Sequence, residues 1–519
     1  MSDPSLKAAP DLAHGIPSAR LEEGVPLLGR FEDRPVVVVR CQGVPRAVSA
    51  ICPHQGAPLE QGQVTGCRLR CPWHHAVFDL ESGEVERGPA LDGLTVYRVI
   101  ERDGVVRVEG LAPPRPAPSA PPRGKGAPPE RVCIVGAGAA GFSAAAALRQ
   151  FGFDGEITML DEQASEPVDR PSLSKEFLAG RLTAGQLALR DAEAFARLRI
   201  ERHLGVVRRI DPVARTVGLG SGVTLSWDRL LLAPGSRAIR LAIPSGALPH
   251  VRTLRTLEDA EAIVALAAEG GPVAVVGSSF IGMETAAALR ARGVEVTIIS
   301  TDAVPFASWL GAELGGLIKS RFEARGVRFL AGRRPYEITP RDVQLDDGTR
   351  VPARMVVVGI GARPRLELAQ RSGIPTGEGI LVDAFLETQR PGIYAAGDVA
   401  ERPAEAGSGR ERTEHWVMAQ RQGRAVAANI LGAGERFTAV PFFWSNFLEM
   451  GCDLTFVGRA PAREPTTELV RSGEGATLLY REAGRLCGVA TVGDDAASLP
   501  AELALEGAGE GALRAVLGI

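Results

Sequence analysis

Short apolar runs, several of them alternating with polar residues, recur through the first hundred residues and predict β-strands. An Asp103–Gly104 pair separates the last two runs, and this pair is a strong signal for a tight hairpin turn. The N-terminal part of the chain is therefore predicted to be a small all-β domain. The predicted strands are residues 34–40, 45–50, 94–100 and 104–110.

Beyond residue 130 the pattern changes to a buried strand, an alanine-rich helix and a second strand. Residues 131–138 (RVCIVGAG) lead into the helix, and residues 156–162 (EITMLDE) form the second strand. The same order returns about 140 residues later, with PVAVVGSS at 272–279 and VEVTIIS at 294–300. This internal repeat predicts two Rossmann-like α/β domains, each with a parallel sheet covered by helices.

Two further regions depart from this pattern. Residues 112–129 hold eight prolines and no bulky apolar side chain, so they cannot build a core and are predicted to form a semi-rigid linker. Residues 437–519 contain mixed short strands and a final helix, which predict a smaller α+β domain.

The chain has 519 residues, of which 45% are hydrophobic and 23% charged, and a formal net charge of −3. This composition suits folded domains and provides no positive field that would attract nucleic acid or an acidic membrane. No apolar stretch of about 20 residues predicts a membrane span, and the first residues lack a signal-peptide pattern, so we expect a cytoplasmic, reducing compartment. Seven cysteines do not indicate a disulfide framework, and Cys41 and Cys67 are expected to be ordinary small strand residues.

Three of the seven histidines and three of the seven cysteines fall within residues 52–75, CPHQGAPLEQGQVTGCRLRCPWHH. One residue separates Cys52 from His54, two separate Cys71 from His74, and sixteen lie between the two pairs. Two thiolates and two imidazoles can bind either a tetrahedral Zn²⁺ or a [2Fe-2S] cluster in which the histidines serve one iron. Zinc sites more often pair cysteine with cysteine and histidine with histidine along the chain.

The two loops, CPHQGAPL at 52–59 and CPWHHAVFD at 71–79, resemble the cluster-binding loops of Rieske proteins, and the resemblance extends to residue 99. Imidazoles in place of two thiolates raise the reduction potential of such a cluster, so that it can accept electrons from a reduced flavin. The resemblance implies four metal ligands: Cys52, His54, Cys71 and His74.

Neighbouring residues refine this interpretation. His75 stands where the family usually has glycine, in a turn that favours positive φ, a region that histidine enters more readily than most residues. His75 is also a rival of His74 as ligand, although the spacing favours His74. Ala57 and Trp73 occupy the places of the extra cysteines that form a disulfide in high-potential Rieske proteins, so the resemblance is to the ferredoxin type.

Gly136, Gly138 and Gly141 form a G-x-G-x-x-G fingerprint between a predicted strand and a predicted helix. The glycines allow a tight turn, close approach of a pyrophosphate and close helix–strand packing, and the helix N-terminus favours the phosphate charge. An acidic residue about 20 positions later completes the pattern of a dinucleotide site, and Asp161 and Glu162 are both candidates.

The stretch DRPSLSK, residues 169–175, resembles a motif of FAD-dependent ferredoxin reductases and apoptosis-inducing-factor-like flavoproteins, which share one fold. The resemblance implies that Arg170 and Lys175 contact FAD and that Glu162 is the ribose-binding acid. Lys175 is one of only four lysines in the chain, and a solvated surface position is its alternative interpretation. The motif and its flanks contain no cysteine, which argues against disulfide reductase chemistry.

Later stretches extend this resemblance. GIYAAGDVA at 392–400 resembles the second flavin motif of the family and implies that Asp398 holds the ribityl chain. The helix that follows it and FFWSNF at 442–447 resemble segments that reach the flavin, with Trp416 and Trp444 as its aromatic neighbours. Either tryptophan could equally be plain core, because tryptophan is usually well buried.

A second glycine fingerprint lies between the two halves of the predicted flavin domain. The resemblance implies that it belongs to the NAD(P)H-binding module. Glu284 corresponds to a family glutamate that pairs with the motif lysine near flavin and nicotinamide. Asp302 is the nearest acid after the second strand of this module, and no nearby arginine suggests recognition of a 2′-phosphate, so NADH is favoured over NADPH. The three glycine positions of this fingerprint are occupied by Gly277, Ser279 and Gly282.

The whole chain resembles a Rieske-fused flavoprotein reductase of the apoptosis-inducing-factor-like type. Nicotinamide delivers two electrons at once and the cluster takes one, so the expected order is NADH, FAD, cluster, and then an external acceptor such as an oxygenase or a cytochrome. Lys175 and Glu284 would tune the flavin and position the nicotinamide. Two alternatives are an accessory electron-donor subunit of a nitrite reductase-like system and a redox-sensing interaction protein.

The resemblance also divides the chain, because the NAD(P)H module interrupts the FAD domain. The expected regions are 15–111 (Rieske domain), 112–129 (linker), 130–248 and 372–436 (FAD-binding domain), 249–371 (NAD(P)H-binding domain) and 437–519 (C-terminal reductase domain).

Overall fold

The computed structural model describes residues 8–113, 129–404, 409–459, 466–493 and 495–519. Residues 114–128, which make up most of the predicted linker, lie outside the described residues. Among the helices of the described ranges, none combines the length and the apolar character needed to cross a membrane.

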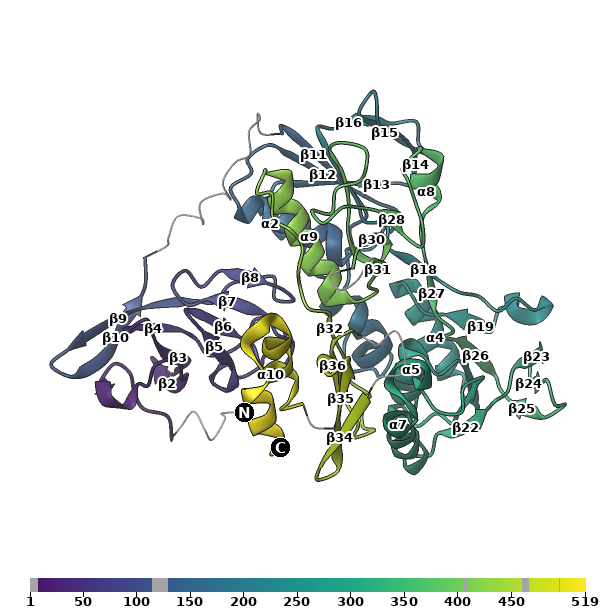
Figure 1. Ribbon diagram of the computed structural model, residues 1–519. Helices are drawn as coiled ribbons and strands as arrows, with labels where there is room; N and C mark the ends of the chain where they lie inside the picture. The colour runs from purple at the N-terminus through teal and green to yellow at the C-terminus, as the bar shows by residue number, and fades with distance from the viewer. Residues whose placement is uncertain (1–7, 114–128, 405–408, 460–465, 494) are drawn as a thin grey trace.

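Antiparallel strands form two sheets in the N-terminal region, at the purple and dark blue end of the chain in Figure 1. The larger sheet contains, in spatial order, β1 (Ile16–Pro17), β10 (Val105–Leu111), β9 (Val96–Arg102), β4 (Val44–Ser49), β3 (Arg34–Cys41) and β2 (Leu27–Phe31). The smaller contains β5 (Gln63–Thr65), β6 (Arg68–Arg70), β7 (Val77–Asp79) and β8 (Val85–Arg87). The predicted hairpin is confirmed: Asp103 and Gly104 join β9 to β10 with φ of 53° and 74°.

The valine run of β3 is buried on both faces of the sheet. Successive side chains of a strand point to opposite faces, so this run serves two cores. Val36 and Val38 pack into one core, and Val37 and Val39 pack into the other. The second core includes the buried side chain of Cys52 and therefore supports the loop that carries it.

The first α/β domain is built around a parallel sheet. Its strands are, in spatial order, β13 (Ile200–Leu204), β12 (Glu156–Asp161), β11 (Arg131–Val135), β17 (Arg229–Leu232) and β29 (Ile393–Ala395). Helices α2 (Ala139–Gln150) and α9 (Trp416–Ile430) pack against each other and into the core of this sheet, as Figure 1 shows. Because β29 and α9 follow the second α/β domain in sequence, two separate chain segments build the first one.

The second α/β domain repeats the strand–helix–strand order of the first, which confirms the internal repeat. Its parallel sheet contains β19 (Val251–Thr253), β26 (Met355–Val358), β20 (Val273–Val276), β21 (Val296–Ser300) and β22 (Arg328–Ala331). The longest helices of this domain are α4 (Leu257–Ala268), α5 (Phe280–Ala291) and α7 (Ala312–Ala324). The central strand β20 is buried throughout, as expected for a parallel strand covered on both faces.

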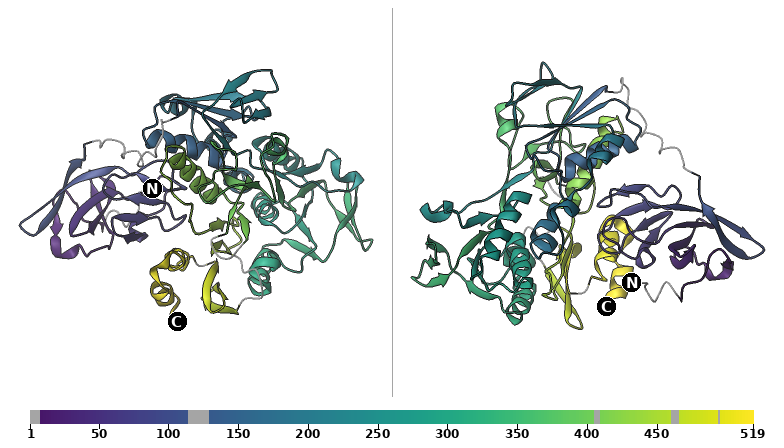
Figure 2. Two further views of the ribbon diagram at one scale, coloured as in Figure 1. Left: turned by 45° about the horizontal axis from the view of Figure 1, so that its top comes forward. Right: turned by 180° about the vertical axis from the view of Figure 1, so that it is seen from behind.

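The C-terminal region is an antiparallel sheet followed by short helices. Its strands are, in spatial order, β32 (Phe442–Ser445), β33 (Leu454–Gly458), β36 (Arg485–Val492), β35 (Gly475–Glu482) and β34 (Thr466–Ser472). The helices are α10 (Ser498–Leu503) and α11 (Gly511–Leu517). Figures 1 and 2 show α10, in yellow, beside the N-terminal β region, and an ion pair between Arg70 and Glu502 joins the two.

Cys41 and Cys67 form a disulfide, with their Cα atoms 5.4 Å apart. Cys41 ends β3, and Cys67 lies in the turn between β5 and β6. The sequence did not predict this bond: both cysteines were expected to be ordinary small strand residues and not metal ligands. The first turn of the smaller sheet packs against the end of β3, and this brings the two cysteines together across a sequence separation of 26. The free cysteines are Cys52, Cys71, Cys133, Cys452 and Cys487.

Candidate functional site

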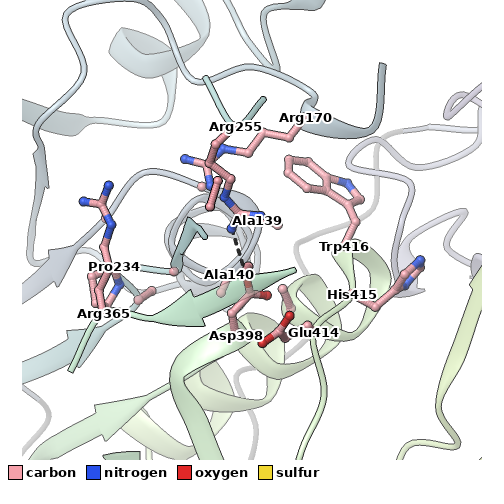
Figure 3. Close-up of a pocket in the computed structure, with 18 of the residues that line it drawn as sticks. Ala139, Ala140, Arg170, Pro234, Arg255, Arg365, Asp398, Glu414, His415 and Trp416 are labelled. Atoms are coloured by element: carbon pink, nitrogen blue, oxygen red, sulfur yellow. Dashed lines mark hydrogen bonds and ion pairs between the residues drawn. The ribbon is translucent and has the colours of Figure 1, made fainter. Parts of the chain in front are cut away.

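A cavity of about 590 Å³ is lined by residues of both α/β domains and of strand β32. Figure 3 shows Arg170, Asp398 and Trp416 around part of it. Eleven residues predicted from the sequence line the cavity: Gly136, Gly138, Asp161, Glu162, Arg170, Lys175, Ser279, Glu284, Asp398, Trp416 and Trp444. Four others do not belong to the lining: Gly141, Gly277, Gly282 and Asp302.

The first glycine fingerprint brings backbone segments closer than side chains would permit. Gly136 has φ 104°, and a Cβ atom there would lie 2.2 Å from the carbonyl oxygen of Ala233. A Cβ atom on Gly141 would lie 1.9 Å from the carbonyl oxygen of Gly136, whereas one on Gly138 would meet nothing nearer than Arg170 at 3.9 Å. No described side chain caps the start of α2, so its backbone N–H groups suit a pyrophosphate.

The two candidate ribose acids, at the end of β12, have different partners. Asp161 is nearly buried, and its carboxylate accepts a hydrogen bond from Arg202 at 2.9 Å. The side chain of Glu162 is 41% exposed and pairs with Arg365. Glu162 therefore has the more accessible carboxylate of the two.

Charged side chains from distant segments converge on the side of the cavity next to the first glycine fingerprint. Nη2 of Arg255 donates to Oδ2 of Asp398 at 2.8 Å, as Figure 3 shows. Burial, and next the charge of Arg255, lower the pKa of Arg170 to about 10. The Arg170 guanidinium therefore remains charged at neutral pH beside the glycine fingerprint. Arg255 and Arg365 belong to no local motif, so the sequence did not predict them as site residues.

Lys175 and Glu284 form a buried ion pair at the cavity wall. Nζ of Lys175 lies 2.8 Å from Oε1 of Glu284, and the two side chains are 8% and 6% exposed. The hydroxyl groups of Ser174 and Ser445 also donate to the Glu284 carboxylate. These contacts fix the lysine charge where the two α/β domains and β32 meet, and they contradict a solvated surface position for Lys175.

The second fingerprint has the same tight backbone contacts as the first. A Cβ atom on Gly277 would lie 2.3 Å from the carbonyl oxygen of Gly359. A Cβ atom on Gly282 would lie 2.2 Å from the carbonyl oxygen of Gly277. The Ser279 hydroxyl donates to the Gly359 carbonyl oxygen at 2.6 Å. Asp302 is exposed in a turn after β21, and the structure does not bring it to the cavity wall.

The four predicted metal ligands lie in two pairs. The Nδ1 atoms of His54 and His74 are 3.1 Å apart, and the thiol groups of Cys52 and Cys71 contact each other. Burial lowers the pKa of His54 to about 4 and that of His74 well below its ordinary value, so both imidazoles stay neutral. Hydrogen bonding to Cys52, and then to backbone N–H groups of its own loop, lowers the pKa of Cys71.

Neutral imidazoles and thiolates are the forms in which these side chains bind metal. One sulfur pair and one nitrogen pair fit a [2Fe-2S] cluster in which thiolates hold one iron and imidazoles hold the other. His75 does not join the group. It has the positive φ expected for its turn, 58°, but its ring contacts the C-terminal region instead.

Trp444 joins the cavity to these four residues. It lines the cavity from β32, and its ring centroid lies 3.9 Å from that of His74 and 6.0 Å from that of His54. His415, also in the lining, lies 5.6 Å from Trp444, and burial lowers its pKa to about 3. The family resemblance implied a place for Trp444 beside the flavin, but neither its contact with His74 nor the presence of His415 was predicted from the sequence.

Two family descriptions match the chain. They are "Rieske [2Fe-2S] domain" over residues 15–98 and "Pyridine nucleotide-disulphide oxidoreductase" over residues 130–423. Apoptosis-inducing factor 3 of Homo sapiens is 36% identical over 427 residues, which cover 79% of this chain and 70% of that protein. The ferredoxin–NAD(+) reductase component of the biphenyl dioxygenase system of Paraburkholderia xenovorans is 36% identical over 321 residues, which cover 61% and 78%.

Solved structures agree with this assignment. The ferredoxin reductase for the CYP199A2 system of Rhodopseudomonas palustris superposes with a TM-score of 0.69 at 32% identity, over 73% of this chain and 95% of that chain. The reductase in the covalent putidaredoxin reductase–putidaredoxin complex gives 0.67 at 32% identity, over 70% and 89%.

These matches confirm the family inferred from the sequence motifs, and the Rieske match sets aside the zinc alternative. The cofactors are FAD, NADH and a Rieske [2Fe-2S] cluster. The chain belongs to the pyridine nucleotide-disulphide oxidoreductase family and carries a Rieske domain on the same polypeptide.

Proposed function

We propose that the protein takes electrons from NADH through FAD to its own Rieske cluster and then to an external acceptor of the oxygenase type. The observation that carries this proposal is the position of Trp444, which lines the cavity and also lies against the His74 ring. When bound, FAD supplies the chemistry that takes up an electron pair as hydride and releases electrons singly.

In this proposal, different residues of the cavity wall bind FAD and NADH. The first fingerprint, with Glu162, Arg170 and Asp398, holds FAD. The backbone around Ser279 faces the NADH side. Ribose recognition by Asp302 stays a prediction, because Asp302 is exposed and lies outside the lining.

The buried pair of Lys175 and Glu284 serves a positioning role in this proposal. The carboxylate holds the ammonium group at a fixed place in the cavity wall, 2.8 Å away, where it would serve the bound flavin and nicotinamide. Ser445 donates to the same carboxylate at 2.6 Å and is the neighbour of Trp444 on β32. The pair is thus tied to the strand through which electrons leave the cavity.

For the cluster we propose Cys52, His54, Cys71 and His74 as the ligands. The neutral imidazoles and the favoured thiolate support this set. Trp444 lies against His74, and its aromatic ring excludes water between the cavity and the cluster ligands.

The relatives support the class of acceptor. Several are named ferredoxin–NAD(+) reductase components of dioxygenase systems, and the putidaredoxin reductase structure is a complex with putidaredoxin. In the present chain the Rieske domain takes the place of a separate first acceptor, so the external partner receives its electrons from the cluster.

We further propose the domain division expected from the sequence, with the FAD-binding domain in two parts, 130–248 and 372–436. The parallel pairing of β29 with β17 supports this division. A cytoplasmic location is proposed as well; the free thiols of Cys133, Cys452 and Cys487 are compatible with it, whereas the Cys41–Cys67 disulfide is more typical of an oxidising compartment. Cell fractionation with an antibody against the protein tests the location.

Anaerobic titration of the cofactor-loaded protein with NADH tests the electron route. Flavin absorbance and the electron paramagnetic resonance of the cluster are recorded together. We expect the flavin to bleach and the signal of a reduced cluster to appear. Cys71→Ser should keep the flavin response and lose the cluster signal. Wild-type protein that bleaches its flavin without any cluster signal would contradict the proposal.

A further inference from the structure

His75, the residue that stands where Rieske sequences usually have glycine, inserts its side chain into the C-terminal region. The side chain is fully buried. Its ring stacks on Phe442 of β32, with ring centroids 4.0 Å apart and ring planes inclined by 24°. Its Nε2 atom lies 3.2 Å from the Ser498 hydroxyl at the start of α10. The histidine therefore occupies a specific position in a neighbouring domain.

The Glu502 carboxylate, on α10, is contacted by side chains from the Rieske domain and from α9. It is fully buried, and its Oε2 atom lies 2.9 Å from Nδ1 of His75 and 2.6 Å from Nη1 of Arg70, both in the Rieske domain. Its Oε1 atom accepts a hydrogen bond from Arg421 of α9 at 2.8 Å. Arg421 also reaches the backbone oxygen of His75 at 3.5 Å.

Such an arrangement is favourable only when all of its members are in place. Burial alone would raise the pKa of Glu502, but Arg421, His75 and Arg70 together hold it well below its ordinary value. A buried charge that loses its partners is strongly unfavourable, so the group favours the docked arrangement of the domains. At its edge, Glu506 pairs with Arg70 at 2.7 Å and with Arg87.

We propose that His75 and Glu502 form an anchor that holds the Rieske domain on the C-terminal domain in the position that receives electrons. This inference rests on the proposed function, and it makes both side chains positioning residues. His75 directly follows the proposed ligand His74, so fixing the His75 ring also fixes the His74 ring against Trp444. The anchor thus accounts for the histidine in a turn that glycine would fit better.

Two substitutions remove the anchor from opposite sides. His75→Gly restores the residue that suits a φ of 58°, so the turn and the cluster ligands are retained while the inserted ring is lost. Glu502→Gln keeps the shape of the side chain and removes its charge. Glu510→Gln is the matched control, because Glu510 pairs with Arg481 of the same domain at 2.6 Å and lies after α10.

Stopped-flow mixing of the full, cofactor-loaded protein with NADH separates flavin reduction from cluster reduction. We expect His75→Gly and Glu502→Gln to reduce their flavin at the wild-type rate. Their cluster reduction should be slower by at least about tenfold, which corresponds to about 1.4 kcal/mol in the barrier. The double variant should be no slower than the slower single variant, because the two changes share the His75–Glu502 contact and their effects should not add. Glu510→Gln should behave as wild type.

Small-angle X-ray scattering of the same oxidised proteins supplies a second readout. Loss of the anchor should increase the radius of gyration in both single variants and leave it unchanged in the control. Wild-type rates of cluster reduction in both single variants, or additive effects in the double variant, would overturn the proposal. If the cluster of the wild-type protein stays oxidised, the proposed electron route is wrong. The scattering data then test the anchor on their own, and an unchanged radius of gyration in both variants would overturn it.

Discussion

The indole ring of Trp444 and the imidazole ring of His74 lie 3.9 Å apart, centroid to centroid, and are inclined by 43°. Trp444 belongs to β32 of the C-terminal region, and His74 belongs to the second Cys/His loop. Only 7% of His74 is exposed, so the imidazole faces protein and not solvent. One aromatic side chain thus separates the nucleotide cavity from a proposed ligand of the cluster.

Trp444→Ala should slow cluster reduction relative to flavin reduction, because it removes the ring that fills the gap between the cavity and His74. We expect the ratio of the two rates, measured by stopped flow with NADH, to fall by at least about tenfold. Trp416→Ala is the matched control: Trp416 also lines the cavity, but the ring contacts of His54 and His74 are with Trp444 and Trp73. An equal fall of the ratio in both variants would contradict a specific role of Trp444.

Glu284→Gln should destabilise the protein strongly, because it leaves the buried Lys175 ammonium without a countercharge. Breaking a buried ion pair from one side costs about 3–5 kcal/mol. Glu323→Gln is the control, since it breaks a partly exposed pair with Lys319 at 3.9 Å, worth less than about 1 kcal/mol. The free energy of unfolding in urea measures both effects. Equal losses would show that the Lys175–Glu284 pair is effectively solvated.

Local motifs carried most of what the sequence could predict. The two glycine fingerprints occupy the strand–helix turns of β11–α2 and β20–α5, because those turns are specified by residues close together in sequence. The Asp103–Gly104 hairpin is specified in the same local way. The pairing of Lys175 with Glu284, 109 positions apart, came from the family resemblance alone, and the structure shows the contact at 2.8 Å.

Contacts between domains could not be predicted, because no local pattern encodes how two folded surfaces meet. The Cys41–Cys67 disulfide depends on how one sheet packs on another. The His75–Glu502 contact depends on the docking of the Rieske domain, so the sequence left His75 as a rival metal ligand. Asp302 shows the opposite case: its position after β21 suggested a ribose contact, but its turn lies outside the cavity lining.

Gly141→Ala should abolish FAD retention, because its Cβ atom would lie 1.9 Å from the backbone oxygen of Gly136 and force α2 away from β11. Gly316→Ala in α7 is the control, since a Cβ atom there meets nothing within 4 Å. Alanine in a helix interior should stabilise that control by about 0.5–1 kcal/mol. The flavin-to-protein absorbance ratio after gel filtration measures retention. Full retention by Gly141→Ala would show that the fingerprint tolerates a wider turn.

Acidification should destabilise the protein through His415. Burial, and next the charge of Lys175, lower the pKa of His415 from 6.5 to about 3, so between these values the unfolded chain binds a proton that the folded chain does not. The free energy of unfolding therefore rises with pH across this window and is lost on acidification, by up to about 1.4 kcal/mol per pH unit. Protonation would also remove the acceptor that caps α9, where Nδ1 of His415 accepts from the Val417 N–H at 3.3 Å.

His415→Asn isolates this contribution, because asparagine can still cap α9 but does not titrate. The difference in unfolding free energy between wild type and variant, measured in urea at several pH values, should change with pH between about 6.5 and 4 and be constant above 7.5. Parallel curves through the acid range would mean that His415 takes up its proton equally in the folded and unfolded chains. Its ring would then be solvated through the cavity, and Trp444 would not be shielded from water on that side.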